Sequence, residues 1–282
     1  MRPGDFFDFA PLDRGRLRTA TALDLVVGVV CAAVLAGWLV GRPLFYTAVA
    51  PVMSPFTALS LLIMVIVRQA RLHLETWPMV LSLAMSGLVL GGNLSSMLML
   101  STMPAELWSS FPTLVLTSVM TSIGLVCFCA YDMVIALRKT PESAFILDDL
   151  LLHLALVPGG LSLLGYLLGN PTYLSVHTDP RVGISLPEMA CLGAYAVAAA
   201  VSNPQLFLWP FLAARRSNRV VFATLFANQF VAPLVVALLL TRPGASGPGL
   251  ELFVMLAGVV TTLTFLVVQA RVLRRPAAVA TP

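Results

Sequence analysis

Four ionisable side chains in the second half of the chain have the types and spacing of a polar ligand site. Glu188 stands in the first turn of an apolar segment, and the stretch just before it carries His177, Asp179 and Arg181. Ionisable groups at the edge of a membrane-length apolar segment are costly and usually functional. We therefore predict a polar ligand site around Glu188, with Glu251 as a further member or as a cap of its own helix. The alternative is a solvated loop in which Glu188 only caps its helix.

Three aspartates and one histidine near other apolar segments are predicted to be structural. Asp24, Asp148 and Asp149 stand where apolar runs begin, and a carboxylate at a helix N-terminus is favoured by the helix dipole. His153 lies one turn after Asp149 and has no second histidine at metal-ligand spacing. We interpret it as a core histidine or as a buried partner of Asp149.

Metal and catalytic chemistry have little support in the sequence. Met97, Met99 and Met103 could offer soft sulfur ligands to Cu(I), but methionine is also a common apolar filler and no histidine or cysteine is adjacent. The chain has no H-E-x-x-H, G-x-S-x-G, Walker or G-x-G-x-x-G motif in a suitable context. We expect no metal, no cofactor and no enzymatic activity.

The elements that must position these residues are predicted to be transmembrane helices. Of 282 residues, 59% are hydrophobic and 11% are charged, against about 25% charged in soluble domains. The apolar runs approach the roughly 20 residues that cross a bilayer as a helix. The sequence predicts an all-α, polytopic transmembrane bundle. Its expected spans are 22–41, 55–67, 78–98, 111–137, 150–168, 186–202, 220–240 and 252–272.

The distribution of basic residues predicts the orientation of these eight spans. Fourteen of the 17 lysines and arginines fall on the side of the N-terminus. The positive-inside rule then places both termini in the cytoplasm of a bacterial inner membrane. Residues 1–21 are expected to be a cytoplasmic segment, either interfacial or loosely ordered, and residues 273–282 a cytoplasmic tail. The inner stretch 203–219 mixes aromatic and arginine residues, which favours contact with anionic lipid rather than nucleic acid.

An internal similarity predicts two parallel units of four spans each, 22–147 and 148–272. Both contain an apolar run that ends in Gly-aromatic-Leu-aliphatic-Gly and is followed by a polar residue and proline. The glycines are Gly37 and Gly41 in the first unit and Gly165 and Gly169 in the second. A repeat of this kind is typical of tandem membrane units.

Small residues predict where helices approach closely and where one bends. The pairs Gly37–Gly41, Gly165–Gly169 and Gly87–Gly91 have the Gly-x-x-x-Gly spacing, which favours packing within the chain or a homodimer. The run Pro158, Gly159 and Gly160 predicts a kink in the fifth span, because proline removes a helix hydrogen bond. Such a kink serves as a hinge or as static packing.

The repeated unit resembles the multi-span N-terminal sensor regions of bacterial hybrid histidine kinases and diguanylate cyclases. Residues 37–41 (GWLVG) and 53–58 (MSPFTA) match their G-[WY]-L-x-G and M-x-P-x-T-A patterns. Residues 165–169 (GYLLG) match the first pattern, whereas 186–190 (LPEMA) lacks the threonine of the second. The resemblance implies a stimulus sensed outside or within the membrane and relayed to a cytoplasmic output domain. The sequence continues only about ten residues past the last span, so we expect the output on a partner protein.

Three functional hypotheses therefore remain open. The first is a sensor-like membrane protein or signalling-partner subunit without its own output domain. The second is a transporter of small solutes or lipids, or a membrane subunit of one, since internal repeats are frequent in transporters. The third is a non-catalytic membrane scaffold. The expected partners are the lipid bilayer, a cytoplasmic signalling protein or another membrane subunit, and a second copy of the chain.

Overall fold

The computed structural model describes residues 14–44, 51–74, 79–102, 116–137, 146–169, 173–174, 183–206, 208–214, 216–240 and 249–274. These residues form helices and connecting turns, with no strand among them. The helices are α1 (Arg14–Leu39), α2 (Pro55–His73), α3 (Met79–Thr102), α4 (Val119–Leu137), α5 (Ile146–Leu168), α6 (Leu186–Ser202), α7 (Leu208–Ala214), α8 (Arg216–Leu240) and α9 (Gly249–Arg274).

The composition of these helices is that of a multi-pass integral membrane protein. Helices α1, α2, α3, α4, α5 and α8 are long and apolar enough to cross a membrane. Helix α6 and the described apolar part of α9 are shorter. The helical membrane bundle predicted from the sequence is thus confirmed. The number of eight spans and the orientation of the termini stay predictions.

Three helix boundaries differ from the predicted spans by six residues or more, and the others by four or fewer. Helix α1 begins at Arg14, within the segment expected to precede the membrane, and α2 continues to His73 rather than ending at residue 67. Helix α4 begins only at Val119, because Ser118 accepts a hydrogen bond from the backbone N–H of Thr121 at 3.1 Å. A serine in this position caps the N-terminus of the helix, so the helix begins directly after it.

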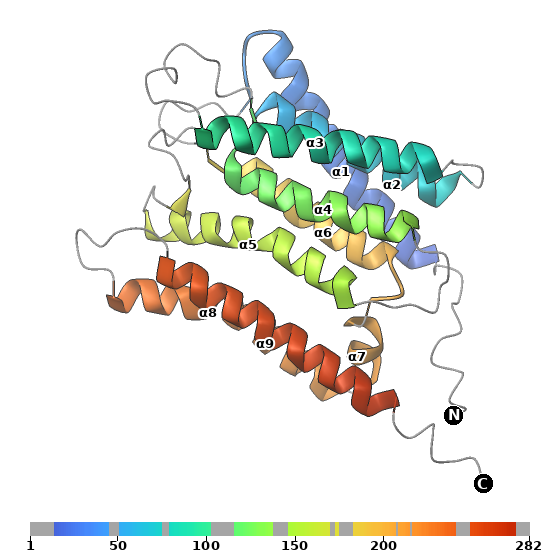
Figure 1. Cartoon of the computed structure of the whole chain (residues 1–282), viewed down its shortest axis with the longest axis vertical. Coiled ribbons are helices and arrows are strands. Elements are labelled where there is room, and N and C mark those ends of the chain that lie inside the picture. Colours follow the sequence, from blue (N-terminus) through green and yellow to red (C-terminus); the bar gives the residue numbers. More distant parts are fainter. Residues whose placement is uncertain are drawn as a thin grey trace.

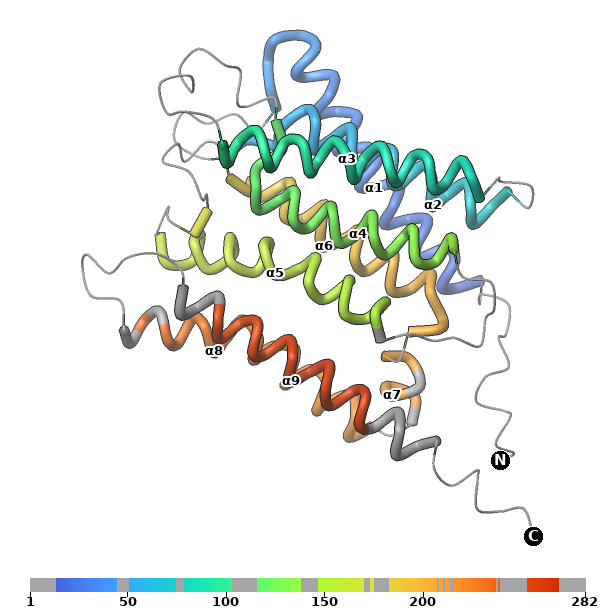
Figure 2. Tube along the Cα trace, in the orientation of Figure 1, coloured from blue at the N-terminus to red at the C-terminus, as the bar shows by residue number. Residues whose placement is uncertain are grey.

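Helices α1 to α6 form a closed ring. Each contacts the next in the sequence, and α6 returns to contact α1. Helices α8 and α9 pair with each other and lie beyond α5, on the side away from α1, α2 and α3 (Figure 1). The tube in the same view shows the short α7 between the end of α6 and this outer pair (Figure 2). The segments of the two predicted four-span units contact each other at two places, α1 with α6 and α4 with α5, and the repeat itself stays a prediction.

Helices α2, α4 and α6 are parallel and begin in the same way. Ser54, Ser118 and Ser185 each precede a helix and accept a hydrogen bond from the backbone N–H three residues later. Such N-caps satisfy backbone donors that have no partner within the helix. Side-chain contacts near the starts of the three helices, and others near their ends, show that the helices run side by side. We call the end where they begin the cap end.

The same spacing places buried residues on the inner face of each of these helices. Counted from the capping serine, positions 3, 7, 10 and 14 recur at intervals of three and four residues, which keeps them on one helix face. These positions are all buried: Thr57, Leu61, Met64 and Arg68 in α2; Thr121, Leu125, Phe128 and Asp132 in α4; Glu188, Leu192, Tyr195 and Ala199 in α6.

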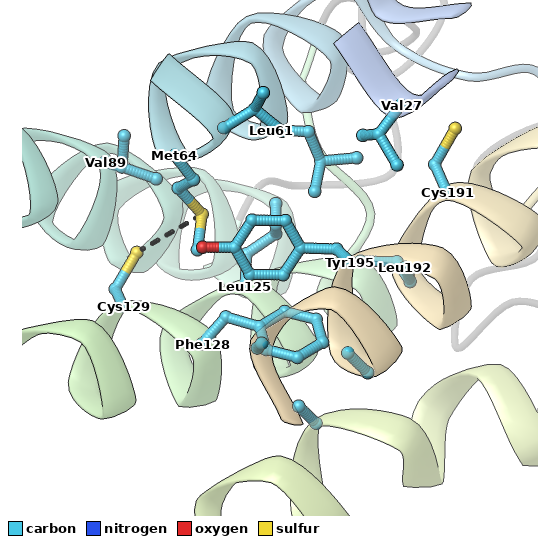
Figure 3. Packing of buried hydrophobic residues seen from close by; sticks show 14 of the residues in the cluster. Val27, Leu61, Met64, Val89, Leu125, Phe128, Cys129, Cys191, Leu192 and Tyr195 are labelled. Atoms are coloured by element: carbon cyan, nitrogen blue, oxygen red, sulfur yellow. Dashed lines mark hydrogen bonds between the residues drawn. The ribbon is translucent and has the colours of Figure 1, made fainter. Parts of the chain in front are cut away.

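Apolar side chains fill the middle of this three-helix core. The rings of Phe128 and Tyr195 meet edge to face with centroids 4.9 Å apart, and the thiol of Cys129 contacts the sulfur of Met64 at 3.8 Å. Figure 3 shows these side chains turned toward one another, with Leu61 of α2 beside them. Close packing of this kind couples the three helices mechanically.

Helices α8 and α9 have a smaller core of their own against α5. Val157, Leu161 and Leu164 of α5 pack with Met255 and Val259 of α9. An added Cβ at Gly160 would lie 2.4 Å from the ring of Phe230, so this glycine admits the α8 side chain. Helix α5 runs through Pro158 as a single element. The predicted kink stays a prediction, and the observed role of Gly160 is packing.

The Gly-x-x-x-Gly pairs do not bring two helices together within the described chain. An added Cβ at Gly37 would lie 2.8 Å from the carbonyl oxygen of Arg42, and one at Gly165 would lie 2.9 Å from Cβ of Tyr173. Both glycines instead make room for the loop that follows their helix. Gly41 and Gly169 have φ angles of 71° and 62°, which suit a glycine that ends a helix.

The third pair needs a further correction. An added Cβ at Gly87 or at Gly91 would meet no atom of the described residues within 4 Å, so neither mediates close packing among them. Gly92 does this instead, since an added Cβ there would lie 2.5 Å from the ring of Phe56. The spacing of glycines alone could not distinguish these positions, because it does not fix which face of α3 turns toward α2.

Candidate functional site

A buried ion pair joins α1 to α2 inside the bundle. The Arg68 guanidinium donates to both carboxylate oxygens of Asp24, one of them from Nε at 2.9 Å. Both side chains are buried, at 1% and 0% exposure. Arg68 also donates to the carbonyl oxygen of Tyr195 at 3.2 Å and stacks on its ring, 3.7 Å from the centroid. Three hydrogen bonds and the stacking on Tyr195 offset the cost of burying this charge.

The same tyrosine connects this pair to a second one. The Tyr195 hydroxyl donates to Oδ2 of Asp132 at 2.6 Å, and Arg71 pairs with Oδ1 of the same carboxylate at 3.0 Å. Arg71 is 24% exposed, whereas Asp132 is buried. We call Asp24, Arg68, Arg71, Asp132 and Tyr195 the charged cluster. It joins α1, α2, α4 and α6 near the end of the bundle opposite to the cap end.

Sequence reasoning did not find the charged cluster. The prediction that Asp24 caps a helix is wrong, because α1 begins at Arg14 and Asp24 lies in its interior. Arg68 and Arg71 were explained by topology alone. Asp132 is the one carboxylate within the apolar run of α4. It could have been recognised from the sequence as an intramembrane ionisable residue. Its partners Arg71 and Tyr195 are more than 60 residues away in the sequence.

Trp209 adds a structural contact beside the charged cluster. Its indole N–H donates to the carbonyl oxygens of Ala200 and Asn203 at 3.0 and 2.9 Å, at the end of α6. The guanidinium of Arg16 lies over its ring, 4.4 Å from the centroid. Trp209 thus ties α7 and the start of α1 to the end of α6, using the aromatic and arginine residues predicted to lie at a lipid interface.

Glu188 forms a second polar cluster at the cap end. The side chain is 1% exposed. Its Oε1 accepts a hydrogen bond from the Thr121 hydroxyl at 2.6 Å, and its Oε2 accepts one from the backbone N–H of Ser185 at 3.2 Å. With the bond from its own backbone N–H to the Ser185 hydroxyl, this completes a capping box. Glu188 does cap its helix, but in a buried setting rather than a solvated one.

Hydroxyl groups from two other helices lead toward this carboxylate. Ser118 hydrogen-bonds Thr121 at 2.8 Å, and Thr121 donates to Glu188. On α2, Ser54 hydrogen-bonds Thr57 at 2.9 Å, and the Thr57 hydroxyl donates to that of Thr117, directly before Ser118, at 3.3 Å. We call Glu188 and these hydroxyls the cap cluster: Ser54, Thr57, Thr117, Ser118, Thr121 and Ser185. It links the first turns of α2, α4 and α6, with the carboxylate between α4 and α6.

The other predicted members of the ligand site cannot be compared with this geometry. His177, Asp179 and Arg181 lie outside the described residues. Glu251 lies in α9, and its side chain also lies outside the described part. Glu188 is therefore the one member of the predicted site that the structure places. The hydroxyls around it were missed, although Ser-x-x-Glu at 185–188 and Ser-x-x-Thr at 54–57 and 118–121 are readable capping patterns.

The acidic start of α5 agrees in part with its prediction. Asp148 and Asp149 lie in the first turn of that helix, where the dipole favours carboxylates. His153 is buried, and its Nδ1 hydrogen-bonds the backbone carbonyl oxygen of Asp149 at 2.7 Å rather than the carboxylate. In the described part of the chain, no three His, Cys, Asp or Glu side chains are grouped as metal ligands. The absence of a metal and of enzymatic activity stays a prediction.

Comparisons with protein-family models, with curated proteins and with solved structures found no match to this chain. The likeness to bacterial sensor regions thus rests on the residues of the motifs, and it stays a prediction. Two buried polar clusters on one set of parallel helices are the feature from which a function can be argued.

Proposed function

We propose that this chain is a membrane signalling protein of the sensor type, which transmits a change at the cap cluster to the charged cluster. One observation carries the proposal: α2, α4 and α6 hold a polar cluster at each end, joined by buried packed side chains. A partner protein in the cytoplasm would receive the signal at the end of the bundle that bears the charged cluster, in a bacterial inner membrane.

The packing between the two clusters supports transmission. Leu61, Leu125 and Leu192 form one buried level of the core, and Met64 and Phe128 belong to the next. A shift in the first turn of any of these helices cannot be absorbed by empty space, since interiors are close-packed. The displacement would then reach the far ends of the helices as a rigid-body motion.

The charged cluster supports the output side of the proposal. Its ion pairs hold α1, α2 and α4 at fixed relative positions, and both depend on the geometry of Tyr195 in α6. A buried hydrogen-bonded network has a few discrete arrangements rather than a continuous range. Arg71 extends from it to partial exposure, where a bound partner could detect the rearrangement.

Transport is a second candidate function, favoured by the buried carboxylate itself. Intramembrane acidic residues such as Glu188 commonly mark ion or substrate pathways. A pathway along the core would have to pass the levels of Leu125 and Phe128, both fully buried. Those levels are occupied by protein side chains, which makes signalling the better-supported function.

The proposal is tested by measuring whether the cap end controls the opposite end. Spin labels on Leu74→Cys, just after α2, and Leu137→Cys, at the end of α4, report the separation of two inner helices, and both positions are exposed. Because Glu188 bonds to the first turn of α4, whose start is hydrogen-bonded to α2 through Thr57 and Thr117, Glu188→Gln is expected to shift the distance distribution between the labels by about 2 Å or more, as in helix movements of switching proteins. Pulsed electron spin resonance in liposomes measures this distance.

The matched control is Thr102→Val at the exposed end of α3, which should leave the label distance unchanged. An identical distance distribution for Glu188→Gln and the native residue would refute transmission. Liposome flux assays on the same samples address the second candidate. Solute or ion flux that depends on Glu188, with fixed label distances, would establish transport instead.

A further inference from the structure

We propose that the stimulus of this protein is a proton, and that Glu188 is the group that binds it. The inference rests on the proposed sensor function and names the ligand of its cap cluster. It requires a carboxylate without a fixed counter-charge, surroundings that respond to its protonation, and a geometry that excludes a metal cation. Each of these follows from the contacts of Glu188.

The first requirement is the absence of a fixed positive charge. The ion pairs of the described residues, Arg68–Asp24 and Arg71–Asp132, both lie in the charged cluster. The titratable groups that interact with Glu188 are Cys31 of α1, Tyr166 of α5 and Cys191 of α6, all uncharged near neutral pH. From α4, the Thr121 hydroxyl donates to its carboxylate at 2.6 Å.

Helix α3 contributes uncharged polar groups at this end of the bundle: Asn93 donates to Ser60 at 3.2 Å, and Ser96 donates to the carbonyl oxygen of Thr117 at 2.9 Å. Within the described residues, the charge of Glu188 is therefore compensated by hydrogen-bond donors and by the positive ends of helix dipoles. Among these residues, a single proton can remove that charge without breaking an ion pair.

The second requirement concerns the direction of the hydrogen bonds. Each serine and threonine hydroxyl has one proton to donate. The chain from Ser118 through Thr121 ends on Oε1 of Glu188, and Oε2 accepts the backbone N–H of Ser185. A protonated carboxyl would need one acceptor where it now meets donors. One hydroxyl chain must then reverse, or the carboxyl must turn away from one of the three helices.

Loss of these bonds acts on three helix starts at the same time. The carboxylate links the first turns of α4 and α6 through Thr121 and Ser185, and the Thr57 hydroxyl of α2 donates to that of Thr117 at the start of α4. Charge-assisted hydrogen bonds are roughly twice as strong as neutral ones. Protonation thus weakens the convergence of α2, α4 and α6 at the cap end, which is the change that the sensor would transmit.

The third requirement distinguishes a proton from a metal cation. Sodium or calcium needs several oxygen lone pairs directed at one point. Around Glu188, O–H and N–H donors occupy the carboxylate oxygens at 2.6 and 3.2 Å. A proton needs only one lone pair of Glu188, so it fits this arrangement, whereas a cation would have to gather hydroxyl oxygens that are now hydrogen-bonded to one another.

Trp38 provides a native reporter for the experiment. Its indole N–H donates to the carbonyl oxygen of Met53 at 3.0 Å, and Met53 directly precedes the capping residue Ser54. We would label the whole chain with 5-fluorotryptophan, assign the Trp38 resonance through Trp38→Phe, and record fluorine NMR spectra in lipid nanodiscs between pH 4 and 9. The native protein is expected to show one reversible transition of the Trp38 resonance.

Two variants link the transition to Glu188. Glu188→Gln should abolish it and hold the resonance near its low-pH position at every pH. Thr121→Val removes one donor to the carboxylate, so its transition should move to higher pH by about one unit, a tenfold change in proton affinity. Thr102→Val, at the exposed end of α3, should titrate like the native protein. The Thr121→Val shift keeps the test decisive if Glu188→Gln does not fold.

Several results would overturn the proposal. They are a pH-independent Trp38 resonance, a transition that persists in folded Glu188→Gln, an unchanged midpoint in Thr121→Val, or a resonance that follows sodium concentration at fixed pH. The spin-label experiment separates this inference from the sensor function. A Trp38 transition without a change in the spin-label distance supports proton binding and refutes signalling. A change in the spin-label distance without a Trp38 transition supports signalling and refutes proton binding.

Discussion

Removing Asp24 should destabilise the protein more than any other single change in the charged cluster. Arg68 is 1% exposed, and Asp24 is the carboxylate that accepts two of its hydrogen bonds. Asp24→Asn keeps the size of the side chain but leaves a buried guanidinium without its counter-charge. Breaking a buried pair in this way costs about 3–5 kcal/mol. We expect a loss of stability of this size.

The neighbouring ion pair provides the internal comparison. Arg71→Met removes the partner of Asp132, but the Arg71 side chain is 24% exposed and Asp132 keeps the hydrogen bond from Tyr195. The loss should then resemble that of one charge-assisted hydrogen bond, about 1.5–3 kcal/mol. The difference between the two variants measures the effect of burial on otherwise similar pairs.

A double variant tests whether the cost is the unpaired charge. Asp24→Leu with Arg68→Met removes both charges and keeps apolar volume, which is often neutral or stabilising for buried pairs. We expect it to be at least 2 kcal/mol more stable than Asp24→Asn. Stability would be measured by far-ultraviolet circular dichroism during denaturant titration in bicelles. If Asp24→Asn cost less than Arg71→Met, or the double variant were the least stable, the reasoning from burial would be refuted.

Three further predictions concern the helix ends. Gly37→Ala and Gly165→Ala should each lower the free energy of unfolding by about 1–3 kcal/mol, because the new methyl would lie within 3 Å of the following loop. Gly87→Ala should be neutral or stabilising. Equal thermal stability of all three variants would contradict this. Gly169→Ala should cost about 1–2 kcal/mol through its φ of 62°, measured in the same denaturant titration, and a neutral effect would exclude that backbone conformation. Ser118→Ala should lower the free energy of unfolding by about 0.5–2 kcal/mol, because it removes the cap of α4. Ser101→Ala, at an exposed position at the end of α3, should leave the stability unchanged. Hydrogen exchange of the first turn of α4 would show whether the loss is local.

The helices were predictable because a membrane span requires little more than a sufficiently long apolar run. The helix boundaries were less predictable: α1 extends to Arg14 although the helix dipole disfavours arginines in its first turns, and α4 begins only after the cap at Ser118. The partners of Glu188 and Asp132 could not be paired from sequence, since Thr121 and Tyr195 are more than 60 residues from them. Hydropathy identifies a segment as apolar, but it does not indicate which face of the helix turns inward.

The contact between α1 and α6 has a consequence for how the chain is assembled during synthesis. Helix α1 is made first, yet the helix that completes the ring begins only at Leu186. At a synthesis rate of roughly 5–20 residues per second, the face of α1 that packs on α6 remains without this neighbour for about 10–30 s. The Asp24–Arg68 pair needs only the first two helices, so the two most deeply buried opposite charges can neutralise each other early in membrane insertion. Variants that lose one partner of this pair and leave the other charge buried should therefore be recognised by membrane quality-control proteases before the chain is complete.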